Sequence, residues 1–271
     1  MQPPPALPVD AVLPELTAAL AAHGRAVLVA PPGAGKTTRV PLALLDAVPG
    51  RIVMLEPRRL AARAAAARLA ETLGEPLGDR VGYRIRGESV PGSRIEVVTE
   101  GILTRMLQSD PSLDGIGCVI FDEFHERSLN ADLGLTLAWE ARAALRPDLA
   151  LVVMSATLDA EPVATLLDGA PVIRSEGRAY PVETCWLDRP LPAGSRLVPE
   201  AARLIAEAEA ATRTLGGTIL AFLPGEGEIR RVQAMLDLGI EVAALYGAMD
   251  FKAQQAVLRP SDGRRVVLAR S

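Results

Sequence analysis

The chain has 271 residues, which is enough for one large domain or two domains of ordinary size. Its 29 Lys and Arg residues against 33 Asp and Glu residues give a formal net charge of -4. Bulk charge therefore does not indicate a nucleic-acid-binding protein, although a local basic face would suffice for one. No apolar run reaches the length of a membrane span, and the Pro-rich start lacks the basic region of a signal peptide. We expect a cytoplasmic protein without membrane segments.

The chain contains two cysteines, Cys118 and Cys185. They have neither the spacing of metal ligands nor that of a disulfide framework. This pattern favours reduced, buried thiols in a cytosolic protein, so we expect no disulfide bond.

Apolar runs alternate with helix-like segments in the first part of the chain. Strands are predicted at residues 26–30, 51–55, 95–98, 118–121 and 149–154, and helices at residues 14–22, 39–46, 60–73, 101–107 and 131–145. Asp10 is a candidate cap for the first of these helices. Polar motifs follow the carboxyl ends of the predicted strands, which is where open α/β sheets bind ligands. The pattern predicts an α/β fold, with a parallel sheet covered by helices on both faces.

A second alternating set follows a Pro- and Gly-rich stretch. Its predicted helices lie at residues 199–215, 226–238 and 252–258, and its strands at residues 218–222, 241–245 and 265–268. This set has no glycine-rich loop, and the sequence ends directly after its last strand. We therefore predict a first domain at residues 1–175 and a second, incomplete domain at residues 176–271.

Residues 30–38, with the sequence APPGAGKTT, have the layout of a phosphate-binding P-loop between a strand and a helix. The glycines let backbone N–H groups curl around an anion, and the helix N-terminus adds partial positive charge. Lys36 can reach the outer phosphates, and the Thr37 hydroxyl can hold Mg²⁺. Ala30 replaces the first Gly of the general pattern, so the loop needs support from other motifs. The residues expected to bind the nucleotide are Pro32, Gly33, Ala34, Gly35, Lys36, Thr37 and Thr38.

Two acidic residues, Asp122 and Glu123, follow the apolar strand at residues 118–121. Adjacent side chains at a strand end diverge, so the two carboxylates can do different work. Asp122 can hold Mg²⁺ through water, and Glu123 can orient and deprotonate a water that attacks the γ-phosphate.

Further polar residues follow other strands. Ser155 and Thr157 come after the strand at residues 149–154, where a role as a helix cap or turn is as plausible as a functional one. Thr99 and the helix opening at Gly101 can contact a backbone phosphate through a hydroxyl and N–H groups. The arginines considered for phosphate contact are Arg58, Arg59, Arg63, Arg84 and Arg86. Of these, the first two follow a Pro at a strand end and therefore point to the ligand-bearing edge.

In this order the motifs resemble superfamily 2 helicases of the DEAH-box group. The matching stretches are residues 33–38, 56–62, 99–103, 122–129 and 155–157, with shorter matches at 222–225, 228–229, 245–247 and 254–255. That family accepts Ala at the start of its P-loop, so Ala30 is no longer an objection. Phe124, which stands where the group name has Ala, and the opening at residues 7–14 resemble the bacterial HrpB subgroup.

The resemblance implies two RecA-like P-loop NTPase domains and an ATP-driven helicase that translocates on single-stranded nucleic acid. RNA is the expected substrate rather than DNA, ATP and Mg²⁺ are the expected cofactors, and a monomer is assumed. By similarity, Lys36 and Thr37 bind the triphosphate and Mg²⁺, Asp122 binds Mg²⁺, and Glu123 serves the attacking water.

The resemblance also assigns roles outside the phosphate site. His125, with Ser155 and Thr157, would couple the nucleotide state to domain closure, and Arg68 would stack on the adenine base. Arg58, Arg59, Thr99 and Gly101 would lie along the nucleic acid.

Two helicase motifs expected after residue 269, one Thr-rich and one with arginine fingers, are not in this sequence. We therefore expect the N-terminal portion of a helicase, which binds ATP but hydrolyses it slowly. The alternative is a truncated module that binds nucleotide or nucleic acid without unwinding. The gene sequence beyond residue 271 would separate these two. A transporter-type P-loop ATPase is disfavoured because a Leu-Ser-Gly-Gly signature is lacking.

Overall fold

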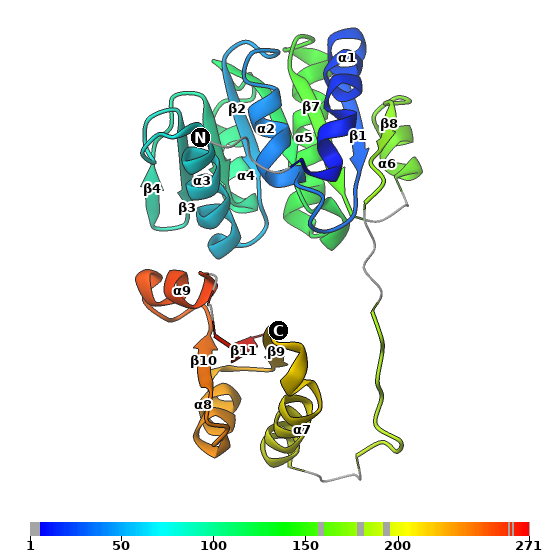
Figure 1. The fold of residues 1–271 in the computed structure, drawn as a ribbon. Coiled ribbons are helices and arrows are strands. Elements are labelled where there is room, and N and C mark those ends of the chain that lie inside the picture. The colour runs from blue at the N-terminus through cyan, green and yellow to red at the C-terminus, as the bar shows by residue number, and fades with distance from the viewer. Residues whose placement is uncertain are drawn as a thin grey trace. The chain divides into compact units, whose positions relative to one another are not determined.

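The computed structural model describes residues 6–156, 160–177, 182–191, 196–259, 261 and 263–270. The chain divides into two compact units, Met1–Pro181 and Val182–Ser271, which are described separately (Figure 1). This division does not test the predicted domains at residues 1–175 and 176–271, which stay a prediction.

An eight-stranded sheet lies at the centre of the first unit, in the order β4-β3-β5-β2-β6-β7-β1-β8 (Figure 1). All neighbouring strands pair in parallel except β3 and β4. The strands are β1 (Arg25–Val29), β2 (Arg51–Leu55), β3 (Val81–Ile85), β4 (Glu88–Val90), β5 (Ile95–Val98), β6 (Ile116–Phe121), β7 (Ala150–Ser155) and β8 (Val172–Arg174). The predicted α/β class with a mostly parallel sheet is confirmed.

Helices cover both faces of this sheet. They are α1 (Leu13–His23), α2 (Lys36–Ala43), α3 (Arg59–Leu73), α4 (Glu100–Ser109), α5 (Leu129–Ala144) and α6 (Glu161–Leu166), with short 3-10 turns η1 (Pro8–Val12) and η2 (Phe124–Glu126). Successive side chains of a strand point to opposite faces. On β1, Leu28 packs in the core formed with α1, α2 and α3, whereas Val27 and Val29 pack in the core formed with α4, α5 and α6.

Several features of the first unit differ from the sequence-based expectations. Helix α2 begins at Lys36 rather than at residue 39, because Gly35 takes a left-handed conformation (φ 94°) that ends the loop directly before it. Asp10 lies within η1 and does not cap α1, whose N-cap residue is Val12. The hairpin of β3 and β4 was not predicted, because its short strands carry Gly82 and polar residues. A Cβ at Gly82 would clash with the Val90 carbonyl oxygen.

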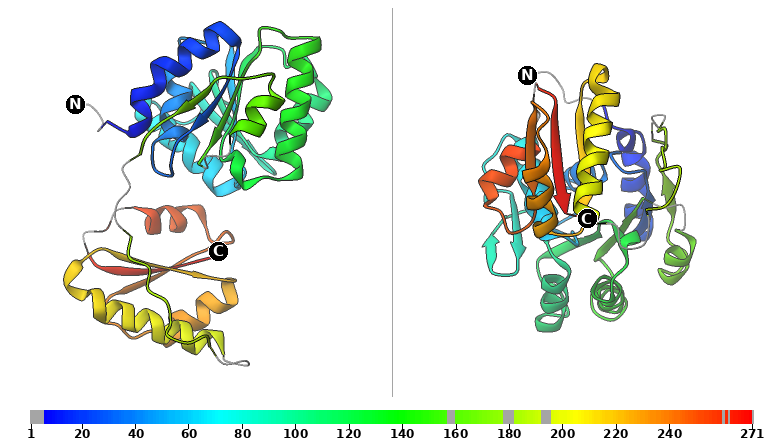
Figure 2. Two further views of the ribbon diagram at one scale, coloured as in Figure 1. Left: turned by 90° about the vertical axis from the view of Figure 1, so that its right-hand side faces the viewer. Right: turned by 90° about the horizontal axis from the view of Figure 1, so that it is seen from below.

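The second unit contains a three-stranded parallel sheet in the order β10-β11-β9. Its elements are α7 (Leu197–Thr212), η3 (Arg213–Leu215), β9 (Thr218–Leu223), α8 (Glu226–Met235), β10 (Glu241–Leu245), α9 (Phe251–Leu258) and β11 (Arg265–Arg270). Helices α7 and α8 lie on one side of this sheet and α9 on the other (Figure 2). Ile229, Val232, Val266 and Leu268 are buried in its core.

The two cysteines are free and lie in different surroundings. Cys118 is buried in β6, as expected, whereas Cys185 is exposed. The prediction of a buried thiol is therefore wrong for Cys185, because the segment 182–191 forms no helix or strand that could cover it. Within the described ranges, no helix is long and apolar enough to cross a membrane.

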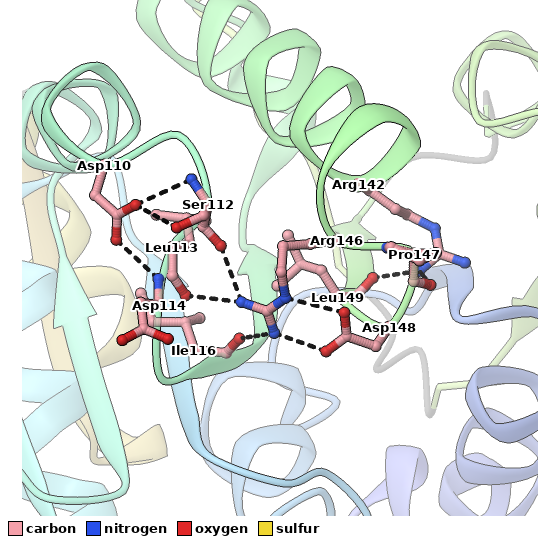
Figure 3. A network of polar contacts seen from close by, with 10 residues as sticks. All are labelled: Asp110, Ser112, Leu113, Asp114, Ile116, Arg142, Arg146, Pro147, Asp148 and Leu149. Atoms are coloured by element: carbon pink, nitrogen blue, oxygen red, sulfur yellow. Dashed lines mark hydrogen bonds and ion pairs between the residues drawn. The ribbon is translucent and has the colours of Figure 1, made fainter.

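Arg146 connects two loops at the amino ends of β6 and β7 (Figure 3). Its guanidinium donates to the carbonyl oxygens of Ser112 at 2.9 Å, Leu113 at 3.1 Å and Ile116 at 3.0 Å. The same group forms an ion pair with Asp148 at 2.7 Å. These contacts join the α4–β6 and α5–β7 connections on the side of the sheet away from the polar motifs.

Replacing Arg146 with Met should destabilise the first unit. The substitution keeps most of the aliphatic stem but leaves three backbone carbonyls without their donor, so we expect the free energy of unfolding to fall by about 1–3 kcal/mol. Urea unfolding followed by circular dichroism measures this change. Arg105→Met, at an exposed position of α4, is the matched control and should change stability by less than about 0.5 kcal/mol. Equal effects of the two variants would contradict the assignment.

Candidate functional site

Four strand ends meet at the carboxyl edge of the large sheet. Backbone hydrogen bonds join Ala30 N–H to the Ser155 carbonyl at 3.0 Å and Asp122 N–H to the Leu55 carbonyl at 3.0 Å. These bonds bring the start of the P-loop, the end of β2, the acidic pair and the end of β7 together. The parallel order of β2, β6, β7 and β1 is what places motifs so far apart in sequence at one edge.

The P-loop has the backbone conformation that its glycines permit. Gly33 and Gly35 both have positive φ, at 76° and 94°, which favours residues without a Cβ. Lys36 begins α2 and is 96% buried, with Nζ donating to the Ala30 carbonyl at 2.7 Å and more weakly to the Pro31 carbonyl at 3.4 Å. The ammonium group therefore lies inside the loop, at the N-terminus of a helix, where an anion is favoured.

The two predicted Mg²⁺ ligands contact each other directly. Thr37 Oγ1 donates to Asp122 Oδ2 at 2.5 Å, although Thr37 lies in the first turn of α2 and Asp122 follows β6. Hydroxyl and carboxylate oxygens are the hard donors that Mg²⁺ prefers, usually one or two from protein with the rest from phosphate and water. No group of three or more His, Cys, Asp or Glu side chains among the described residues could hold a metal ion. The Thr37 hydroxyl and the Asp122 carboxylate are two hard oxygen donors, a set that fits Mg²⁺ whose other ligands are phosphate and water.

The acidic residues at this edge are buried close to one another. Burial raises the pKa of Asp122 to about 6, and the charge of Glu123 adds to the rise, while the hydrogen bond from Thr37 opposes it. Burial also raises the pKa of Glu56 to about 8, and Asp122 and Glu123 add to it. A cation bound among these carboxylates would instead lower their pKa values.

A cavity of about 410 Å³ opens beside the acidic residues. Its lining residues come from α2, the end of β2, α3 and the segment after β6. They are Thr37, Thr38, Glu56, Arg58, Ala61, Ala64, Ala65, Arg68, Glu123 and Glu126. Thus Arg68, expected near the adenine base, and Glu123, expected near the γ-phosphate, face one space.

Glu123 and His125 connect the acidic pair to the end of β7. Glu123 has φ 49°, a left-handed conformation that is unusual for a residue with a side chain and is enriched at functional sites. His125 Nδ1 lies 3.3 Å from Glu123 Oε2 and 3.3 Å from the Ala156 backbone nitrogen. His125 Nδ1 can accept a hydrogen bond from the Ala156 N–H when Nδ1 carries no proton. It can donate one to Glu123 when Nδ1 carries a proton, but it cannot do both at once.

Four of the five arginines considered for phosphate contact fall into two groups. Arg58 and Arg59 are exposed near the carboxyl edge, the former paired with Glu126 at 2.5 Å and the latter donating to the Arg86 carbonyl at 3.1 Å. Arg63 instead forms an ion pair with Glu88, and Arg84 forms one at 2.7 Å with the buried Glu96. These last two pairs hold the β3–β4 hairpin to α3 and β5. Such a use was not expected for Arg63 or Arg84.

The remaining predicted residues are spread along the same edge. Arg68 is exposed on α3 and pairs with Glu71 at 2.6 Å. Thr99 is the N-cap residue of α4, and the exposed Gly101 lies in its first turn. Ser155 is buried at the end of β7. Thr157 lies outside the described residues, and the N-cap residue of α6 is Ala160.

One residue of the cavity was overlooked in the sequence. Glu56 stands before Pro57 at the end of β2, inside one of the matching stretches, but its carboxyl group received no role. The signal was an acidic residue directly after four buried apolar positions. Such a residue is placed at the ligand-bearing edge by the same rule that was applied to Asp122.

Comparisons with known proteins agree with this geometry. Residues 12–166 match the profile of the DEAD/DEAH box helicases. The chain is 51% identical to the ATP-dependent RNA helicase HrpB of Escherichia coli K12, over 97% of this chain and 33% of that protein. It is 34% identical to an ATP-dependent RNA helicase HrpA homolog of Haemophilus influenzae, over 98% of this chain and 21% of that protein.

A solved structure resembles the whole fold. The crystal structure of the Escherichia coli DEAH/RHA helicase HrpB superposes with a TM-score of 0.88 at 50% sequence identity, covering 97% of this chain and 34% of that one. The chain thus spans about a third of the length of these HrpB proteins.

The buried Glu56 should make stability depend on pH. In the absence of divalent cations, the pKa of Glu56 is about 8 in the folded protein, whereas the ordinary pKa of a Glu side chain, which applies to the unfolded chain, is 4.5. Between these values the folded state binds more protons, so the free energy of unfolding falls as pH rises. Glu56→Gln should reduce that fall by about 1–3 kcal/mol between pH 5 and pH 8. Urea unfolding at several pH values measures it.

A matched control is Glu15→Gln, at an exposed position of α1, which should keep the wild-type slope. Identical pH profiles for wild type and Glu56→Gln would show that Glu56 is ionised in the folded protein.

Proposed function

The chain belongs to the DEAD/DEAH box helicase family, and we propose that it binds ATP with Mg²⁺ on the loop at residues 30–38 and hydrolyses it with Glu123 as general base. The observation that carries this proposal is the direct contact of Thr37 with Asp122, beside the buried Lys36. A phosphate-binding loop, a Mg²⁺ ligand pair and a nearby carboxylate are the parts that phosphoryl transfer to water requires. The motif-based resemblance to this family, and to HrpB within it, is confirmed by the similarity of sequence and fold.

Each residue has a task that follows from its surroundings. Lys36 exchanges its bonds to the Ala30 and Pro31 carbonyls for phosphate oxygens, and the N–H groups at the start of α2 face the same anion. Thr37 and Asp122 would hold Mg²⁺, which supplies neutralisation of phosphate charge. Glu123 would orient the attacking water and accept its proton.

The proton on His125 offers a connection between this chemistry and β7. When His125 Nδ1 donates to Glu123, it releases the Ala156 N–H, and when it accepts from Ala156 it releases Glu123. We propose that His125 transmits a change in the hydrogen bonding of Glu123 to the end of β7. This is the coupling role that the resemblance implies for His125, Ser155 and Thr157.

We further propose single-stranded RNA as the nucleic-acid partner, bound along Arg58, Arg59, Thr99 and Gly101. The support is that these residues lie at one sheet edge and that the similar proteins are named RNA helicases. Translocation and unwinding by the whole protein belong to this proposal, since the chain spans about a third of HrpB. A cytoplasmic location stays a prediction.

Two substitutions separate nucleotide binding from hydrolysis. Lys36→Ala removes the buried cation, and we expect the affinity for ATP to fall by about tenfold or more. Glu123→Gln keeps the shape but not the base, so ATP binding should persist while turnover falls by about 10²–10⁴-fold. Equilibrium binding of labelled ATP and phosphate release, with and without RNA, measure both.

Glu140→Gln, at an exposed position of α5, is the control and should behave as wild type. If the Glu123→Gln variant turns over ATP at the wild-type rate, Glu123 is not the base. ATP binding without any wild-type turnover would favour the alternative of a binding module without unwinding activity.

Arginine substitutions test the nucleic-acid edge. Arg58→Ala and Arg59→Ala should each weaken single-stranded RNA binding by about 3- to 10-fold. Each should also reduce the slope of log K against log salt concentration by about 1, which corresponds to one counterion fewer released. Filter binding with RNA, DNA and duplexes at stated salt concentrations measures this. Arg80→Ala, just before β3 at the other edge of the sheet, should leave binding unchanged. A loss as large in Arg80→Ala would mean that RNA binds by diffuse charge alone.

A further inference from the structure

The segment Leu7–Asp10 lies against the P-loop, although it precedes α1 and β1 in the sequence. Val9 N–H donates to the Ala34 carbonyl at 3.1 Å, and the Val9 side chain is fully buried in the core shared with α1 and α2. One peptide of the P-loop is thus fixed by a residue outside the loop. The role of this segment was not apparent from the motifs.

Leu7 packs on the loop beside that bond. A Cβ at Gly35 would lie 2.6 Å from Leu7 Cδ1 and 3.1 Å from Leu7 Cβ, so the Leu7 side chain fills the space that a side chain at Gly35 would need. Gly35 is the residue directly before Lys36, and its left-handed conformation starts α2. Leu7 therefore contacts the peptide that orients the first N–H groups of the helix.

Asp10 connects this segment to the first turn of α2. Its Oδ2 accepts from Leu7 N–H at 2.8 Å, and its Oδ1 lies 3.4 Å from Arg39 Nε. Arg39 N–H donates in turn to the Gly35 carbonyl at 2.9 Å. The contacts form a closed ring through Leu7, Asp10, Arg39 and Gly35.

We propose that Leu7, Val9 and Asp10 form an amino-terminal clamp that positions the P-loop for ATP. This inference rests on the proposed function of the loop. A loop with two glycines has many conformations, and ordering it on binding opposes affinity. A clamp that holds the Ala34 and Gly35 peptides beforehand reduces that opposition, so these three residues set nucleotide affinity without touching the nucleotide.

Leu7→Ala in the full 271-residue chain is the test. It removes the packing on Gly35 but leaves the loop sequence intact, and we expect the Kd for labelled ATP to rise by about 5- to 10-fold. Leu7 is only half-buried, so the melting temperature should fall little. Leu7→Ile restores an apolar side chain of the same size and should bind within about twofold of wild type.

The control is Leu20→Ala, at a buried position in the last turn of α1. It creates a core cavity, so it should lower the melting temperature more than Leu7→Ala does while leaving the Kd for ATP unchanged. A merely structural role for Leu7 would make affinity follow stability in both variants. The clamp predicts that the two quantities separate.

Each outcome decides the question. Tight ATP binding by Leu7→Ala would overturn the clamp and leave the proposed function standing, provided that Lys36→Ala weakens binding in the same assay by about tenfold or more. Equal weakening by Leu20→Ala would also overturn it. A wild-type chain that binds no ATP would overturn both proposals. If Leu7→Ala does not fold, Asp10→Asn, which spares the apolar packing, should raise the Kd by about 2- to 5-fold, and no change would count against the clamp.

Discussion

The hydrogen bond between Thr37 and Asp122 is the contact on which the arrangement of the site depends. It joins the first turn of α2 to the end of β6, and through them the P-loop to the acidic pair. Neither residue could reach the other unless β6 and β1 lay near each other in the sheet, separated by β7. The contact therefore depends on the strand order, and it brings together two oxygen donors of the kind that suits Mg²⁺.

Around this contact the protein buries ionisable side chains that have few oppositely charged partners among the described residues. Lys36 is held by two backbone carbonyls, and Asp122 and Glu56 have raised pKa values because they are buried near other carboxylates. Such an arrangement favours ligands that bring the missing charges, a phosphate for the lysine and a cation for the acids. The side chains of the site complete only part of its electrostatics, and under the proposed function a metal–phosphate ligand would supply the rest.

The arginines show how far a sequence pattern carries. Arg58, Arg59, Arg63 and Arg84 were all considered for phosphate contact, and charge alone does not separate them. Arg63 and Arg84 pair with Glu88 and Glu96, because the β3–β4 hairpin folds back on α3 and β5, while Arg58 and Arg59 stay exposed. The hairpin was missed for a local reason, since its strands are short and mixed in polarity.

The sequence by itself determined most of the strands, the P-loop and the acidic pair, because apolar runs that end in polar motifs obey local rules of periodicity and backbone conformation. Residues 51–55 and 95–98 became β2 and β5 without a shift. Only the tertiary structure decided which polar groups meet. Glu56 joins the acidic pair, and Leu7 covers Gly35, through contacts between segments that are distant in the chain. Such contacts depend on strand order and packing, which no local pattern encodes.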